Sequence, residues 1–138
     1  MNLSLNPEFG GQLPDEIANL QNLEELFFSR SHLSGTIPAL NSMVYLQNLE
    51  LYGNMLEGVI PDLSNNKNLK RIDVFNNKLS GTFPRSLGTL PDLQIVSLKK
   101  NHFSGTLPSE LGNLSMLHWL DVSYRFIDVN SFHVDKAC

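Results

Sequence analysis

The chain contains a single cysteine, Cys138, among its 138 residues, so no disulfide can form within it. A lone cysteine is neutral between an intracellular protein and a piece of a secreted one. It also provides no Cys cluster for a structural zinc, which needs several Cys or His ligands at short spacing. No metal and no cofactor are therefore expected.

Basic residues are scarce as well, with 10 Lys and Arg against 14 Asp and Glu and a net charge of −4. A nucleic-acid-binding protein needs a basic face, so this class of partner is not expected. No apolar run reaches the roughly 18 residues of a membrane span, so we expect no direct membrane insertion by this segment. The opening residues, MNLSLNPEFG, lack the charged region and apolar core of a secretory signal.

Catalytic groupings are missing too. The four histidines (His32, His102, His118 and His133) are scattered, and no glycine-rich phosphate loop or kinase signature occurs. We therefore expect no enzyme activity in this chain. Any kinase activity of a longer parent protein would lie outside it.

The sequence does contain a repeat, seen most clearly in LPDLQIVSLKKNHFSGTLP from Leu90 to Pro108. The same spacing of Leu, Asn, Gly and Pro recurs around positions 6, 31, 54 and 77, and Ser31 stands where the other copies have Asn. Self-similarity at a fixed period of 20 to 50 residues indicates stacked structural units.

The shared pattern, LxxLxxLxLxxNxLxGxIP, closely resembles the plant-type leucine-rich repeat of receptor-like kinase and receptor-like protein ectodomains. The resemblance implies an α/β-type leucine-rich repeat solenoid with a short parallel sheet on its concave face. Irregular or 3₁₀ segments are expected on the convex face, and no polar capping unit is visible. The repeats are predicted to span 1–124, with a partial first repeat at 1–14 and a sixth beginning at 114. The pattern is lost from Arg125, so 125–138 is read as a degenerate repeat or an aberrant tail.

Within each repeat the two leucine-type residues of the strand are predicted to face the core. These pairs are Leu26 and Phe28, Leu49 and Leu51, Ile72 and Val74, and Val96 and Leu98. Each buried side chain contributes about 1.5–3 kcal/mol. The stacked amides of Asn54, Asn77 and Asn101 are expected to satisfy turn backbone in successive coils. The glycines at 35, 58, 81 and 105 suit a positive φ or close approach of coils.

The outward positions of these strands are left free by the repeat, so they are where a binding function is expected. Large aromatic side chains stand there beside charged ones, a composition typical of protein-binding hot spots. Packing is the competing explanation, since cross-strand aromatic pairs stabilise a sheet by about 0.2–1 kcal/mol each. The predicted partner-binding residues are Phe27, Glu50, Tyr52, Arg71, Asp73, Phe75, Lys99, Trp119, Asp121 and Tyr124. Other positions read as facing solvent include Ser29, Arg30, Asn76, Ser97 and Lys100.

Two Asn-x-Ser sequons occur, at Asn2 and Asn113. Asn113 is the better glycosylation candidate, because it precedes a new repeat on the outer turn, where a glycan can be accommodated. Asn2 is expected on the strand surface and is the weaker candidate.

The resemblance implies a binding module for a protein or peptide ligand, or for a co-receptor ectodomain. Its location would be the extracellular face of the plasma membrane or the secreted space, as part of a longer parent. Two alternatives stay open. One is a secreted inhibitor of the polygalacturonase-inhibiting type, although paired terminal cysteines and a signal peptide are absent. The other is a stand-alone intracellular scaffold, if the chain is complete as given.

Overall fold

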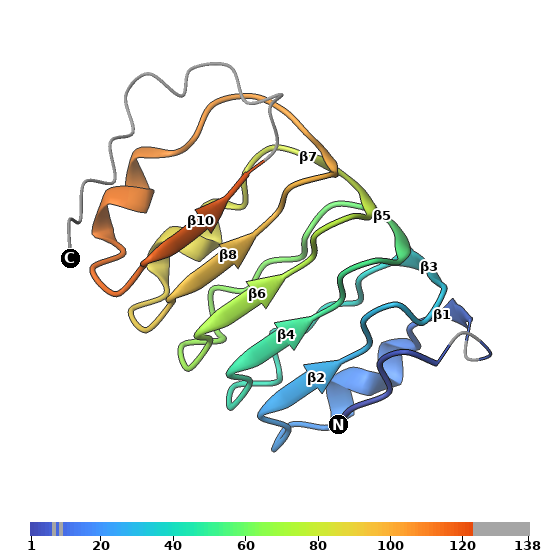
Figure 1. Cartoon of the computed structure of the whole chain (residues 1–138). Helices are drawn as coiled ribbons and strands as arrows, with labels where there is room; N and C mark the ends of the chain where they lie inside the picture. The colour runs from blue at the N-terminus through green and yellow to red at the C-terminus, as the bar shows by residue number, and fades with distance from the viewer. Residues whose placement is uncertain (7, 9, 123–138) are drawn as a thin grey trace.

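The computed structural model describes residues 1–6, 8 and 10–122, and these form a solenoid of parallel strands and short 3₁₀ helices (Figure 1). Tyr124 and the predicted tail at 125–138 lie outside the described residues. The described strands belong to two parallel sheets of five strands each. We call them the inner sheet, which is the one predicted for the concave face, and the lateral sheet.

The inner sheet has the strand order β10-β8-β6-β4-β2, one strand from each successive coil. Its strands are β2 (Glu25–Phe27), β4 (Asn48–Glu50), β6 (Arg71–Asp73), β8 (Ile95–Ser97) and β10 (Trp119–Asp121). The register places Leu49 between Leu26 and Ile72, so equivalent repeat positions stack directly. Residues 1–5 continue this ladder, because Asn2 forms a parallel bridge with Phe27. The predicted fold class is confirmed.

The lateral sheet was not predicted. Its strands, in the order β1-β3-β5-β7-β9, are β1 (Gly11–Gln12), β3 (Leu33–Thr36), β5 (Met55–Gly58), β7 (Lys78–Gly81) and β9 (His102–Phe103). Each strand is short and most contain glycine, which has low strand propensity, so the local sequence gives little sign of it. These segments are aligned because equivalent positions of successive coils stack on one another.

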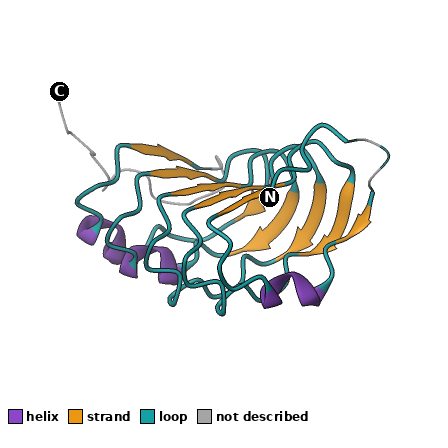
Figure 2. Cartoon of the chain, turned by 90° about the horizontal axis from the view of Figure 1, so that it is seen from below, coloured by secondary structure: helices purple, strands orange, loops and turns teal. Residues whose placement is uncertain are grey.

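Three 3₁₀ helices follow prolines in the longer repeats: η1 (Asp15–Asn19), η2 (Arg85–Thr89) and η3 (Ser109–Asn113). Each proline fixes φ near −70° and so prepares the entry to the turn. Figure 2 shows the helices on the side of the coil away from the inner sheet. In one shorter repeat an Asp62–Ser64 turn takes the helix's place. The Ser64 N–H and hydroxyl donate to the Asp62 carboxylate and lower its pKa.

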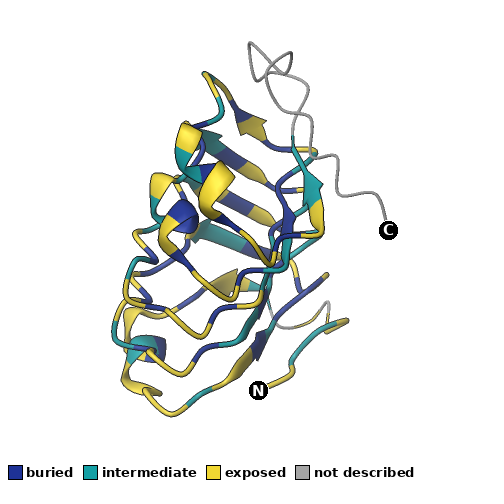
Figure 3. Cartoon of the chain, turned by 90° about the vertical axis from the view of Figure 1, so that its left-hand side faces the viewer, coloured by how far each residue is buried: buried dark blue, intermediate teal, exposed yellow. Residues whose placement is uncertain are grey.

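The core forms one continuous cluster along the solenoid, visible as buried segments between exposed outer turns (Figure 3). All four predicted inward pairs are buried to within 2% exposure, which confirms them. The reason is the alternation of side chains along each strand, which turns every second residue inward.

The predicted asparagine ladder is also confirmed. The Oδ1 atom of Asn77 accepts the Leu56 N–H, while its Nδ2 donates to the carbonyls of Leu51 and Val74. One side chain thus bonds to both its own coil and the preceding one. Ser31, which replaces Asn in the second coil, donates its hydroxyl to the Leu3 carbonyl and so keeps one of these links.

Asn66 is a buried polar residue that the sequence analysis did not single out. It is fully buried at the position where neighbouring coils carry Met43 and Leu90. Its Nδ2 donates to the carbonyls of Leu40 and Met43, but no donor among the described residues reaches its Oδ1. A buried acceptor left in this state costs stability.

Candidate interaction surface on the inner sheet

The outward residues of the inner sheet lie in four columns that run across the coils. Strand register and backbone hydrogen bonds define them. In order along the strand they are: Glu25, Asn48, Arg71, Ile95 and Trp119; Phe27, Glu50, Asp73, Ser97 and Asp121; Ser29, Tyr52, Phe75 and Lys99; and Arg30, Gly53, Asn76 and Lys100.

Two of the residues read as facing solvent are in fact buried, so that part of the prediction is wrong. Ser29 is 1% exposed because residues 1–5 lie against it: its N–H donates to the Ser4 hydroxyl and its carbonyl accepts the Leu5 N–H. Ser97 is 9% exposed, a small side chain between longer neighbours on the adjacent strands. Alternation alone did not reveal what covers each position.

Three of the predicted residues form a compact ion cluster. Arg71 Nε lies 3.0 Å from Glu50 Oε1, and its terminal nitrogen lies 3.2 Å from Asp73 Oδ2. All three side chains are partly buried. A separate pair joins Lys99 Nζ to Asp121 Oδ1 at 3.7 Å. Most of the charge on these predicted residues is therefore balanced within the sheet itself.

Tyr52 and Phe75 are neighbours in the third column, and both are half-buried. The Arg30 guanidinium lies 5.7 Å from the centre of the Tyr52 ring, and Lys100 Nζ lies 5.2 Å from the centre of the Phe75 ring. These four side chains come from four successive coils. We call them the cation–aromatic row.

Arg30 and Lys100 were predicted to face solvent but were not among the predicted partner-binding residues, and both lie beyond the strand ends. Their column leaves the sheet with a left-handed backbone: φ is 54° at Arg30, 57° at Asn76 and 56° at Lys100. In the sequence, Arg30 and Lys100 occupy the same repeat offset as Gly53 and Asn76.

Of the other predicted aromatics that the structure describes, Trp119 stands in the first column and Phe27 in the second. Trp119 is 57% exposed on β10, whereas Phe27 is half-buried on β2, and these strands lie at opposite ends of the inner sheet (Figure 1). Tyr124 lies outside the described residues. Trp119 and Phe27 therefore lie apart from each other on the inner sheet.

The two sequon asparagines are both exposed. Asn113 ends η3, on the side away from the inner sheet, while Asn2 lies at the sheet edge and its Oδ1 accepts the Ser4 N–H.

Within the described residues, no three His, Cys, Asp or Glu side chains are grouped so that they could hold a metal ion. In the same part of the chain, no helix combines the length and apolar character needed to cross a membrane.

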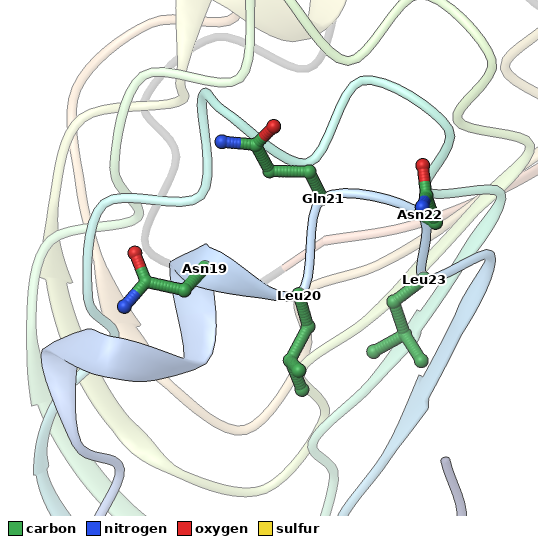
Figure 4. Close-up of a pocket in the computed structure, with 5 residues that line it drawn as sticks. All are labelled: Asn19, Leu20, Gln21, Asn22 and Leu23. Carbon is green, nitrogen blue, oxygen red and sulfur yellow. The ribbon is translucent and has the colours of Figure 1, made fainter.

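A hollow of about 370 Å³ lies elsewhere, against the stretch between η1 and β2 (Figure 4). Its lining residues are Asn19, Leu20, Gln21, Asn22 and Leu23. None of them is titratable and none belongs to the predicted site. This hollow offers no group suited to catalysis.

Comparison with known proteins agrees with the geometry. The family described as Leucine Rich Repeat matches residues 68–90 and 92–114. A solved BIR3–SERK2 complex from Arabidopsis thaliana contains a chain 32% identical, with a TM-score of 0.76, over 91% of this chain and 69% of that one. The chain belongs to the leucine-rich repeat family.

Larger plant receptors contain similar stretches. This leucine-rich repeat chain is 37% identical to a chain of the PEPR1–AtPEP1 structure, with a TM-score of 0.85 over 88% of its length. It is 39% identical to a chain in the complex of the Arabidopsis receptor kinase HAESA with the peptide hormone IDA and the co-receptor SERK1, with a TM-score of 0.78 over 83%. It spans only 17% and 20% of those chains. The comparison with curated proteins gives no match.

Proposed function

We propose that this chain is a non-catalytic binding module that holds a protein or peptide ligand on its inner sheet. The observation that carries the proposal is the cation–aromatic row, in which two half-buried rings stand beside two exposed cations. The repeat does not need these positions for its core. Aromatic and Arg side chains of this kind are enriched in protein-binding hot spots. The similar receptors PEPR1 and HAESA, solved with AtPEP1 and IDA, support the same class of ligand.

A comparison of two faces of the same chain tests this function. Peptides selected from a random library on the immobilised chain are titrated against the wild type and the Tyr52→Ala/Phe75→Ala variant. The control variant is Met55→Ala/Val59→Ala, which removes two apolar side chains that are 44% and 61% exposed on the lateral side. We expect at least about a tenfold loss of affinity for the inner-sheet variant, as for truncated hot spots, with an unchanged circular dichroism spectrum. Equal losses in both variants, or a loss confined to the control, would contradict the proposal.

We further propose that the module belongs to the ectodomain of a receptor-like kinase or receptor-like protein, on the extracellular side of the plasma membrane. The similarity to stretches of much longer receptors supports this context. The test is the mass of the native gene product before and after deglycosylation. A product far above 15.5 kDa that shrinks on deglycosylation is expected, and Asn113→Gln should remove part of that shift. A product of 15.5 kDa that does not shift would favour the intracellular scaffold instead.

A further inference from the structure

We propose that the cation–aromatic row recognises an extended acidic segment with carboxylates at positions i and i+4 and an apolar side chain at i+2. The inference rests on the proposed function and defines the ligand chemistry of the same surface. Arg30 and Lys100 would each bind one carboxylate, and the rings of Tyr52 and Phe75 would receive the apolar side chain between them.

The spacing of the row sets the spacing of the carboxylates. Arg30 and Lys100 are separated by three steps between neighbouring coils. Adjacent strands lie about 4.8 Å apart, so the backbones of these two residues stand roughly 14 Å apart. Their charged groups lie 5.7 Å and 5.2 Å from the centres of the Tyr52 and Phe75 rings between them. An extended chain rises about 3.3 Å per residue, which puts residues i and i+4 about 13 Å apart. Residues i, i+2 and i+4 also point to the same side of such a chain.

The charges of the row remain available to a ligand. Arg71 and Lys99 already have carboxylates beside them, at Glu50, Asp73 and Asp121. Among the described residues, no such ion pair involves Arg30 or Lys100, and both side chains are exposed. These two cations therefore face ring surfaces and solvent, and a carboxylate can approach them without displacing an internal one.

The backbone holds the row in place. A Cβ added to Gly53 would lie 3.0 Å from Arg30 Cγ, so the stem of Arg30 runs across this glycine and positions the guanidinium beside Tyr52. Gly53 and the short side chain of Asn76 occupy the column between the two cations. The two ends of the row thus carry the charges, and its middle consists of the two aromatic rings.

Synthetic peptides with neutral Gly-Ser flanks provide the test. The probe contains Glu-Ser-Leu-Ser-Glu, and its matched controls contain Gln-Ser-Leu-Ser-Gln and the misspaced Glu-Glu-Leu-Ser-Ser. Dissociation constants are measured for the wild type, Arg30→Gln, Lys100→Gln and the control Lys78→Gln, which removes an exposed cation from the lateral sheet.

We expect the correctly spaced acidic probe to bind the wild type about tenfold more tightly than the Gln peptide, a difference of about 1.4 kcal/mol. Arg30→Gln and Lys100→Gln should each remove part of this preference, whereas Lys78→Gln should remove none. High salt should weaken the preference, because the ion pairs between the peptide and these exposed cations are screened. Circular dichroism and thermal melts confirm that each variant is folded.

Three results would overturn the inference: equal affinity for the Glu and Gln peptides, equal affinity for the misspaced peptide, or the same loss from Lys78→Gln as from Arg30→Gln. No measurable binding of the acidic probe at about 1 mM, where the free energy of binding is near −4.1 kcal/mol, also counts against it. Binding that ignores the carboxylates but is lost in Tyr52→Ala/Phe75→Ala would leave the proposed function standing and remove only the acidic specificity.

Discussion

Two buried asparagines of the same coil are expected to affect stability in opposite ways. Asn77 uses its amide fully, accepting from Leu56 and donating to two carbonyls in two coils. Asn66 leaves its Oδ1 without a donor among the described residues, although it is more deeply buried, at 0% exposure against 7% for Asn77. The contrast follows from the rule that a buried polar group stabilises only when its hydrogen bonds are made.

Asn77→Ala should therefore lower the free energy of unfolding by about 2–4 kcal/mol, because it leaves a buried N–H without its acceptor and removes two donors. Urea denaturation followed by circular dichroism measures the change. The control is Asn68→Ala, which removes one exposed hydrogen bond to the Val44 carbonyl and should cost less than about 0.5 kcal/mol. A similar loss of unfolding free energy in both variants would show that the buried asparagine ladder stabilises the fold no more than an exposed hydrogen bond does.

Asn66→Leu should raise the free energy of unfolding by about 1 kcal/mol, because an isosteric apolar side chain removes the unsatisfied acceptor. The two carbonyls that lose Nδ2 keep backbone donors, since Leu40 accepts from Met43 and Met43 accepts from Leu46. The same urea titration measures this. A loss of stability would mean that the two amide hydrogen bonds outweigh the orphaned oxygen.

At the scale of elements, the lateral sheet depends on close contact between coils. Gly81 has a φ of 91°, and a Cβ there would lie 3.0 Å from Val59 Cγ1 of the preceding coil. Gly58 combines a φ of 76° with a similar contact to Thr36 at 3.1 Å. A glycine is needed at these positions for both reasons, its positive φ and the approach of its neighbour.

Gly81→Ala should accordingly cost about 1–3 kcal/mol, because an L-residue is strained at positive φ and its methyl group meets Val59. Gly112 in η3 provides the matched control, with no positive φ and open space around its added Cβ. Gly112→Ala should be neutral or stabilise by about 0.4–1 kcal/mol through the unfolded chain. Thermal melts of the two variants compare them directly, and equal destabilisation would refute the argument.

At the scale of the whole molecule, the described coils form a stack in which each coil pairs in sheet order with its neighbours. The stability of such an array is approximately the sum of the intrinsic stability of each repeat and the interaction free energy between adjacent repeats. Leu20, in the coil of η1, is 45% exposed, whereas Met43 and Leu90 at the same repeat position of later coils are fully buried. Opening should therefore be easier at this end than in the middle.

Native-state hydrogen exchange should show this gradient. We expect the amides of β4 and β6 to be the most protected and those of residues 10–14 to exchange at least about tenfold faster, as local opening costs less there. Mass spectrometry of peptic fragments measures the exchange. Uniform protection across the described coils would instead mean that they unfold as one cooperative unit.

The proposed binding surface was only partly predictable from the sequence. Alternation along the strands located Tyr52, Phe75 and Arg71 on the outward side, because that periodicity is a local property of the chain. It did not separate the ion cluster from the cation–aromatic row. It placed Arg30 and Lys100 toward solvent but did not include them among the partner-binding residues. Those contacts join residues of different coils, and their partners follow from register and from the left-handed turns beyond the strands.

The sequence by itself determined the family, the period of the solenoid, the core pairs and the asparagine ladder. Each of these follows from a spacing of residue types that repeats along the chain. Only the tertiary structure decided the lateral sheet, the burial of Ser29 and the unsatisfied amide of Asn66. These depend on which atoms the neighbouring coil brings into contact. A repeat pattern states what every coil has in common, whereas stacking decides what each side chain meets.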